Sequence, residues 1–262
     1  MLKRFVIIIF TTLALTSNVV AGTDGELILK KNKPSEIKDC SEKFNRATFA
    51  FNQVLDGAIF KPVATVYKKL PSQLRAGVGN SLDNLSNLIT IPNNILQGDF
   101  AKAGVNTGRL VLNTTVGIFG IFDVAQQLGL DEYEKEDFGQ SFARHGIGPG
   151  CYIVLPVLGP STVRDTIGSV VNFTGGDAWY NVTVKNDTQY FSEIDYYSSK
   201  VTSGVDFRAK NFNAIENLEK NSLDFYASVK SLYLQDRQQK ILNTKKIIET
   251  QDDSDWEEIE NK

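Results

Sequence analysis

Few residues in this 262-residue chain have the side-chain chemistry of a catalytic or metal site. The sequence contains one histidine, His145, and two cysteines, Cys40 and Cys151. A metal centre needs several nitrogen, sulfur or carboxylate ligands, and no neighbouring cysteine or second histidine accompanies His145. The segment 139–143, GQSFA, lacks the last glycine of the Gly-x-Ser-x-Gly turn that presents a nucleophilic serine. We therefore predict a protein that is not an enzyme and that uses neither a metal nor a cofactor.

Binding chemistry is the alternative, and the segment 138–165 is the part of the chain that suggests it. Its sequence, FGQSFARHGIGPGCYIVLPVLGPSTVRD, holds five of the 20 glycines and three of the seven prolines. Proline fixes φ and removes a backbone donor, whereas glycine permits positive φ, so this segment must turn repeatedly while it stays apolar. We interpret it as a wall that lines a binding space, followed by a helix that begins at Thr162 with Ser161 as its cap. The candidate wall residues are Tyr152, Val154, Leu155 and Pro156.

A second unusual stretch, VGIFGIF at 116–122, is apolar on every side and carries two glycines. An amphipathic surface helix would show polar residues on one face, and this stretch shows none. Two interpretations stay open, a buried turn between helices or an apolar hairpin that faces a membrane or a channel. The hairpin residues are Val116, Gly117, Ile118, Phe119, Gly120, Ile121 and Phe122.

The helices that must position these segments are indicated by apolar residues at helical spacing. One stripe runs from Phe44 to Leu70, and a second from Leu74 to Leu88 is expected to end at a break over 90–92. Another helix is expected from Asp99 to about Leu112, and the charged run 131–137 is expected to be a solvated loop. No segment alternates strongly, so the fold class is all-α with little or no sheet. We assign 39–248 to a single helical domain.

The two ends of the chain have other signatures. Residues 1–21 combine a basic start with an apolar run of about a dozen residues, which is typical of a signal peptide. The tripeptide Val19-Val20-Ala21 suits cleavage before Gly22, and no cysteine stands there to be lipidated. Residues 22–38 are then an N-terminal linker. Residues 249–262 carry seven acidic residues and one basic residue, and we expect this tail to be disordered.

The charge balance bears on the partner. The formal net charge of −3 becomes −5 when Lys3 and Arg4 leave with the signal peptide, and the acidic tail, with seven acidic residues and one basic residue, accounts for more than all of that excess. The body of the chain is therefore nearly neutral. Because nucleic-acid binding is dominated by basic side chains, nucleic acid is excluded as the expected partner.

Several short motifs follow one another between Asp39 and Gly168 in the order of a known family. Taken together they resemble the MlaA/VacJ family, and an ordered series of this kind is far more specific than any one of its members. The motifs are KFNR at 43–46, VLD at 54–56, KPVA at 61–64, LQGD at 96–99, Arg109 with LNT at 112–114, FDVA at 122–125, FGQS at 138–141, and Arg164-Asp165. The candidate family-motif residues are Phe44, Asn45, Arg46, Arg164 and Asp165.

The resemblance implies a fold and a function. It implies a single ring-shaped helical domain in the inner leaflet of an outer membrane, around an amphipathic channel. Misplaced phospholipids would leave the outer leaflet of the outer membrane through this channel, which would maintain lipid asymmetry. The implied partners are phospholipid, the outer membrane, a porin trimer and a soluble periplasmic lipid carrier. The implied location is the periplasmic side of the outer membrane.

Two departures from the family pattern affect these expectations. Family members are commonly lipoproteins, whereas this signal has no cysteine to acylate, so we expect an exported chain that is not lipidated. Cys40 and Cys151 stand where the family tends to place proline. We predict that a disulfide joins them and restores the lost rigidity, while two unpaired buried cysteines remain the alternative.

Two other functions remain open at this stage. The first is an exported lipid hydrolase, which the absent nucleophile motif disfavours. The second is an outer-membrane surface or scaffold protein without transport activity, in which the apolar segments are core. If the hairpin instead gates a channel, Gly117 and Gly120 would lie on one side of a helical turn. Bulky residues at these positions would then alter lipid flow more than folding, and Ile118→Asp would weaken membrane contact.

Overall fold

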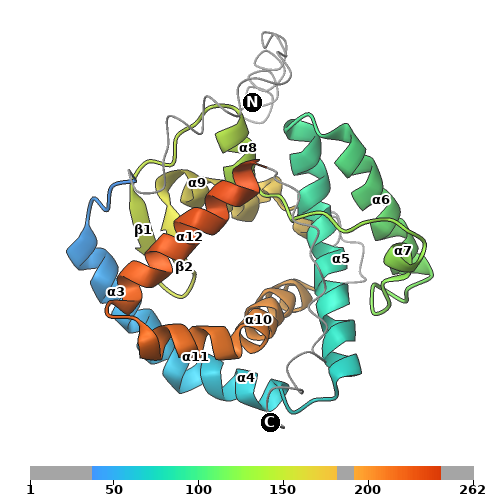
Figure 1. Ribbon diagram of the computed structural model, residues 1–262. Helices are drawn as coiled ribbons and strands as arrows, with labels where there is room; N and C mark the ends of the chain where they lie inside the picture. The colour runs from blue at the N-terminus through green and yellow to red at the C-terminus, as the bar shows by residue number, and fades with distance from the viewer. Residues whose placement is uncertain (1–36, 182–191, 243–262) are drawn as a thin grey trace, which may run out of the picture. The chain divides into compact units, whose positions relative to one another are not determined.

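The structure is a computed structural model that describes residues 37–181 and 192–242, and within these ranges it is mostly helical (Figure 1). All of these residues belong to one compact unit, Pro34–Lys262. The all-α prediction is confirmed, and one small β-hairpin is the addition to it. The elements are α3 Glu42–Leu55, the π-helix η2 Asp56–Phe60, α4 Lys61–Tyr67, α5 Ser72–Leu96, α6 Phe100–Thr115, α7 Val124–Gln127, α8 Phe138–Arg144, β1 Tyr152–Leu155, β2 Gly159–Thr162, α9 Val163–Val171, the π-helix η3 Asn172–Gly176, α10 Glu193–Lys210, α11 Phe212–Asn221 and α12 Phe225–Leu242.

Three expectations concern residues outside the described ranges. These are the signal peptide at 1–21, the linker at 22–38 except for its last two residues, and the acidic tail at 249–262. They stay predictions, as does the ring shape. Over 37–181 and 192–242, every helix is too short or too polar to pass through a bilayer.

The longest helix, α5, is where the predicted helix break proves wrong. The helix continues through Pro92 to Leu96. Proline lacks the backbone donor of a helical turn, and the side-chain amide of Asn93 donates to the carbonyl of Ile89 at 2.8 Å in the same turn. Hydrogen bonds to α6 hold α5 on both sides of the proline, at Asn84 before it and at Asn94 after it, and Ser141 of α8 donates to Asn93 at 2.7 Å. Tertiary packing therefore overrides the local signal.

The side chains buried between α5 and α6 are mostly polar and of modest size. Its buried side chains include Asn84 and Asn94 of α5, and Asn106 and Asn113 of α6. The amide of Asn106 donates to Asn94 at 2.8 Å, and that of Asn84 donates to the Thr114 hydroxyl at 2.8 Å. A buried amide without a partner is costly, so these bonds fix how the two helices sit against each other.

The helix α12 is held against α8 and α9 by a partly buried ion network. Arg237 binds Asp137 with both guanidinium amino groups and reaches Asp165 at 2.9 Å, and the Tyr233 hydroxyl donates to Asp165 at 2.7 Å. Burial opposes ionisation, yet Arg237 holds the pKa of Asp137 below its usual value. The solvated loop predicted at 131–137 is therefore wrong at its end, because Asp137 is ion-paired and Glu136 is buried.

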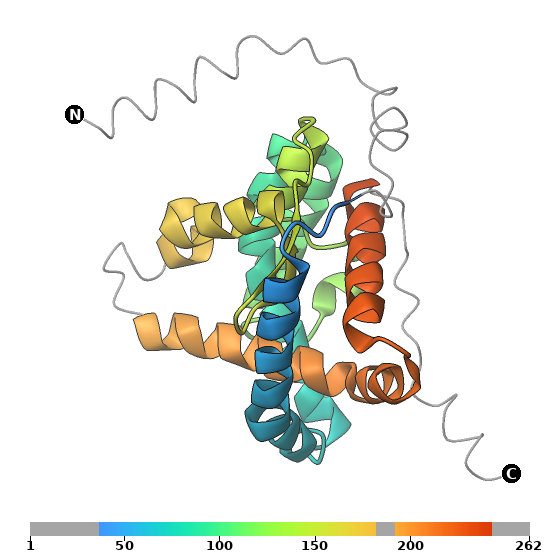
Figure 2. The same ribbon diagram turned by 90° about the vertical axis from the view of Figure 1, so that its left-hand side faces the viewer.

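In Figure 2, α9 and the start of α10 lie on one side of the unit, and α12 lies on the other.

The short strands β1 and β2 pair antiparallel, with Tyr152 opposite Thr162 and Leu155 opposite Gly159. The cap of α9 lies one residue later than expected. The hydroxyl of Thr162 accepts from the backbone of Asp165, whereas Ser161 belongs to β2 and bonds to Thr166. The helix therefore begins at Val163, and the expected cap at Ser161 is wrong.

Two asparagines of α3 hold the outer edge of β1. Asn45 donates to the carbonyl of Tyr152 at 3.0 Å and accepts from the backbone of Val154 at 3.0 Å. Asn52, two turns along, does the same for Leu155 and Val157. A side-chain amide has one donor side and one acceptor side, so each asparagine substitutes for a missing neighbouring strand.

A disulfide lies at the end of this contact. Cys40, just before α3, is bonded to Cys151, just before β1, and their Cα atoms are 5.7 Å apart. The bond closes a loop with a sequence separation of 111 residues. It therefore ties α3 to β1 covalently beside the bonds of Asn45.

We expect the single variants Cys40→Ser and Cys151→Ser to lower the free energy of unfolding by about 4 kcal/mol, because a long loop is released in the unfolded chain. The double variant serves as the control and should lose no more than either single variant, since one bond is removed in each case. Chemical unfolding in detergent measures the loss. Alkylation of two thiols in the unreduced wild-type protein would refute the pairing.

Candidate functional site

The apolar segment 116–122 follows α6 as a non-helical turn whose large side chains are exposed. The relative exposures are 63% for Val116, 55% for Ile118, 69% for Phe119 and 55% for Phe122, and Ile121 is also exposed. The interpretation of a buried turn is therefore wrong for these side chains. We call residues 116–122 the apolar loop. Exposed apolar side chains this close together mark a surface that meets lipid, ligand or protein.

The two glycines of the apolar loop are buried at its base, and each is required by close approach. A Cβ on Gly117 would lie 2.2 Å from the carbonyl oxygen of Phe122 and 2.6 Å from that of Asn113. A Cβ on Gly120, which has φ of +86°, would lie 2.7 Å from the Cβ of Asn84. The expected helical turn is absent. Bulky residues at these positions would break the loop itself, so they cannot separate gating from folding, and that expectation is wrong.

Between the glycines, Ile118 and Phe119 have φ of 52° and 55°. This left-handed conformation costs roughly 1–2 kcal/mol for a residue with a Cβ, and most for a β-branched residue such as isoleucine. The chain accepts that cost while both side chains extend away from the protein. Strain combined with exposed apolar surface is characteristic of a functional segment, not of core packing.

A polar cluster fixes the two ends of the apolar loop. Asn113 donates to Asp123 at 2.9 Å and accepts from the backbone of Ala125 at 2.9 Å. Arg109, which is buried, donates to Asp123 at 2.7 Å and to the carbonyl of Leu130 at 2.6 Å. Burial would raise the pKa of Asp123, but the bonds from Asn113 and Arg109 outweigh burial and lower it. Asp123 is therefore an ionised anchor and the cap of α7.

The apolar loop also rests on α5. The amide of Asn80 donates to the carbonyl of Ile121 at 3.1 Å, and a Cβ on Gly77 would lie 3.1 Å from the side chain of Ile121. Asn84 bonds Thr114 one turn further along α5. Sequence motifs pointed to Arg109, Asn113 and Asp123 only as parts of a pattern. Their convergence on one loop was visible only in three dimensions.

The expected wall at 152–156 is placed differently. Tyr152 and Val154 are buried in a small apolar core with Tyr226 and Leu234 of α12, so they cannot line a binding space, and this prediction is wrong for both. Leu155 is half-buried, and Pro156 is exposed. Alternation along β1 explains the result, since successive side chains point to opposite faces of a strand.

The family-motif residues fall at two places. Asn45 holds β1, and Arg46 pairs with Glu42 and Asp224 and lies over the ring of Tyr226. Arg164 binds Asp165 at 2.9 Å in the α12 network. The contacts of these four residues, Asn45, Arg46, Arg164 and Asp165, are structural. Phe44, in contrast, is exposed and belongs to an outward-facing stripe.

That stripe covers α3, η2 and α4. The buried residues of these helices are small or polar, namely Asn45, Thr48 and Ala64, while the large apolar side chains point outward. The exposed members are Phe44, Phe51, Val54, Ile59, Val63 and Val66. The helical periodicity of the sequence is real, but its apolar face does not form the core.

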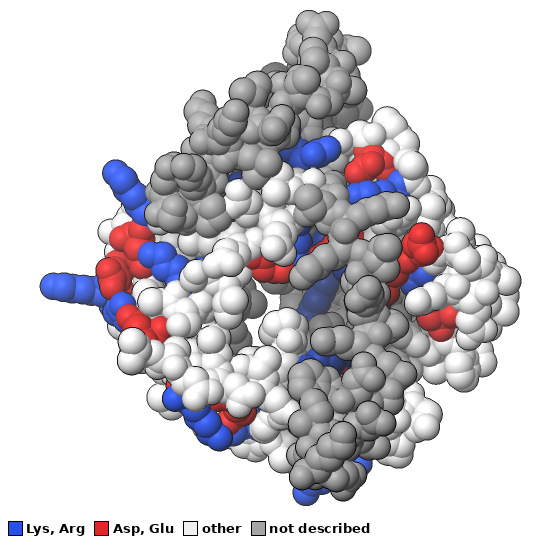
Figure 3. Space-filling model, in the orientation of Figure 1, with Lys and Arg blue, Asp and Glu red and all other residues white. Residues whose placement is uncertain are grey.

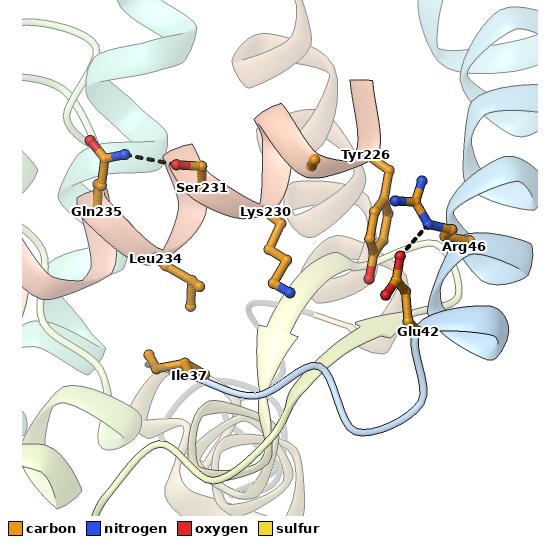
Figure 4. Close-up of a pocket in the computed structure, with 9 residues that line it drawn as sticks. Ile37, Glu42, Arg46, Tyr226, Lys230, Ser231, Leu234 and Gln235 are labelled. Carbon is orange, nitrogen blue, oxygen red and sulfur yellow. Dashed lines mark hydrogen bonds and ion pairs between the residues drawn. The ribbon is translucent and has the colours of Figure 1, made fainter. Parts of the chain in front are cut away.

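A cavity of about 500 Å³ lies between the start of α3 and α12 (Figure 4). Its charged groups are already satisfied, because Arg46 pairs with Glu42 at 2.7 Å and Lys230 pairs with Asp39 at 3.2 Å. It therefore offers no free charge to a ligand. Among the described residues, no group of three or more histidine, cysteine or carboxylate side chains could hold a metal ion.

Comparison with known proteins gives a consistent result. The family described as MlaA lipoprotein matches residues 37–240. An uncharacterised protein of Rickettsia bellii is 35% identical over 205 residues, which are 78% of this chain and 76% of that protein. The intermembrane phospholipid transport system lipoprotein MlaA of Haemophilus influenzae is 30% identical over 223 residues, with 83% of this chain and 84% of the relative covered. The protein of that name in Escherichia coli is 31% identical over 201 residues, with 75% and 76% covered.

A solved structure is similar in fold as well. It is described as the structural basis for maintenance of bacterial outer membrane lipid asymmetry. It matches with a TM-score of 0.65 and 31% sequence identity, over 78% of this chain and 99% of that one.

The geometry of the apolar loop leads to a prediction about its glycines. Gly117→Ala and Gly120→Ala should each lower the free energy of unfolding by at least about 2 kcal/mol, because the added Cβ meets backbone or a packed asparagine. Gly104→Ala is the matched control, since nothing lies within 4 Å of a Cβ there. It lies inside α6 and should stabilise the protein by about 0.5–1 kcal/mol. Equal effects at the three positions in chemical unfolding would contradict the account of the loop.

Proposed function

The chain belongs to the MlaA family, and we propose that it is a phospholipid-transport component of the outer membrane. In this proposal it removes mislocalised phospholipids from the outer leaflet and passes them through a channel to a soluble periplasmic carrier, beside a porin trimer. The result is maintained lipid asymmetry. The observation that carries the proposal is the apolar loop, strained and exposed on a rigid polar base, in a chain whose relatives are named as lipid-transport proteins.

The outward apolar surface supports a membrane location. The stripe on α3 and α4 and the apolar loop present large side chains without any covering element of the described chain. At about 25 cal/mol per Å² of apolar surface removed from water, a few hundred Å² would hold such a protein at a bilayer. In this arrangement α3 and α4 would lie within one leaflet, with their exposed apolar faces in contact with the acyl chains.

The mode of anchoring follows from the same surface. The relatives are named lipoproteins, whereas the first cysteine of this sequence is Cys40. Its sulfur is bonded to Cys151, so it offers no thiol for acylation. We propose that burial of this apolar surface holds the chain at the membrane and that Cys40 carries no acyl chain. The intact mass of the mature protein tests the second part, because each acyl chain adds a fixed increment.

Lipid extraction tests the proposed function directly. The full chain is purified in detergent, repurified without added lipid, extracted with organic solvent and analysed by mass spectrometry. Recovery of phospholipid in proportion to protein is expected of a transport component. A plain surface or scaffold protein would return none, and this outcome would overturn the proposal.

Charge placed on the apolar loop gives a sharper test. Ile118→Asp should raise outer-leaflet phospholipid in cells, because a charge is costly where the loop meets lipid. Aspartate accepts the left-handed conformation of this position more readily than isoleucine, so the fold should be kept. Ile118→Leu is the control and should leave outer-leaflet phospholipid at the wild-type level. Wild-type outer-leaflet phospholipid in Ile118→Asp cells with normal protein levels would exclude a role for the loop.

A further inference from the structure

A second feature of α5 lies on a face next to the one that carries the apolar loop. Gly79, Asp83 and Asn87 are spaced four residues apart, so they follow one another along the helix at intervals of one turn. Asn80 and Asn84, which hold the loop region, lie on the neighbouring face, since each residue advances by about 100°. The row Gly79, Asp83 and Asn87 therefore runs beside the base of the apolar loop.

Two lysines lie at the ends of this row. The ammonium group of Lys210, from α10, would be 2.8 Å from a Cβ on Gly79. The ammonium group of Lys135, from the segment before α8, donates to Asn87 at 3.2 Å. Asp83 is thus flanked by a lysine about one helical turn away in each direction. In Figure 3 the surface is hollowed between α10 and α12, and basic side chains are visible on the α5 side of that hollow.

Each lysine already has its own carboxylate. Lys210 pairs with Asp206 at 2.8 Å, and Lys135 pairs with Glu132 at 2.9 Å. The Asp83 carboxylate has no hydrogen bond or ion pair with any residue in 37–181 or 192–242. The group therefore contains three carboxylates and two ammonium groups, and Asp83 supplies the unbalanced negative charge.

Burial makes that unpaired carboxylate costly. Burial raises the pKa of Asp83, and Lys135 and Lys210 only partly offset this. A half-buried charge without a protein partner is less stable than a fully solvated one, so pairing with a ligand of opposite charge would stabilise it. The ligand must bring a positive group to Asp83 and can also bring a negative group to Lys210.

We propose that Asp83 and the flanking Lys210 bind the headgroup of a zwitterionic phospholipid with a primary ammonium group. Asp83 accepts hydrogen bonds from the ammonium, and Lys210 donates to the oxygens of the adjacent phosphate. A headgroup that carries phosphate but no ammonium leaves Asp83 unpaired and beside a like charge. The site therefore selects phosphatidylethanolamine over phosphatidylglycerol.

This inference rests on the proposed function, and a competition assay tests both separately. The full chain in detergent is equilibrated with mixed micelles of equal phosphatidylethanolamine and phosphatidylglycerol, repurified and analysed for bound lipid. The wild-type protein should enrich phosphatidylethanolamine. Asp83→Asn should lower the ratio of the two lipids about tenfold, since one charge-assisted hydrogen bond of ordinary strength is lost.

Three further measurements make the assay decisive. Asp236→Asn, on the exposed face of α12, is the matched control and should keep the wild-type ratio. Lys210→Gln should lower the amounts of both lipids and leave their ratio unchanged, because both headgroups share the phosphate. The melting temperature of Asp83→Asn should equal or exceed that of the wild type, because the variant removes a half-buried charge that has no partner among the described residues.

The outcomes separate the two ideas. Recovery of both lipids at the input ratio from the wild type, or an unchanged ratio in Asp83→Asn, would overturn the headgroup site and leave transport intact. Recovery of no phospholipid from the wild type would overturn the proposed function together with the site that rests on it.

Discussion

The side-chain hydrogen bonds of buried asparagines between α5 and α6 are the constraint on which the rest of the structure depends. Large apolar side chains of this helix pair are exposed, and its buried residues are asparagine, threonine, glycine, Ala103 and Arg109. Apolar contacts tolerate sliding, whereas a buried amide must keep its partner at about 2.9 Å. The Asn94–Asn106 and Asn84–Thr114 bonds therefore fix the register of the two helices.

The position of the apolar loop follows from that register. The loop leaves the end of α6 and returns through Asp123, whose carboxylate is held by Asn113 and Arg109 of the same helix. The glycines of the loop also restrict its movement, because Gly117 is packed against backbone atoms and Gly120 against Asn84. The strained backbone of Ile118 and Phe119 persists because the residues on either side of it are held in fixed positions.

Sequence reasoning reached the helical class, the family and the Cys40–Cys151 pairing, because these depend on local periodicity and ordered motifs. It failed where the outcome depends on which face of an element is exposed or on which distant residues pack against it. Periodicity along α3 reveals an apolar face but not whether core or lipid covers it. Tyr152 was expected at a wall because the Gly/Pro turns around it are irregular, yet strand alternation buries it. The continuation of α5 through Pro92 and the burial of Glu136 depend on neighbours that are distant in the sequence.

The helix α5 brings two unlike environments to neighbouring faces of one rigid element. One face supports the apolar loop at Gly120 and Ile121, and the next carries Asp83 between two lysines. A phospholipid has the same division, since its acyl chains are apolar and its headgroup is charged. Under the proposed function, a lipid beside α5 would keep its chains toward the loop and its headgroup toward Asp83. The hydrogen bonds to α6 hold α5 in a fixed position. A movement of the loop that displaced α5 would therefore also displace Asp83 and change how it binds the headgroup.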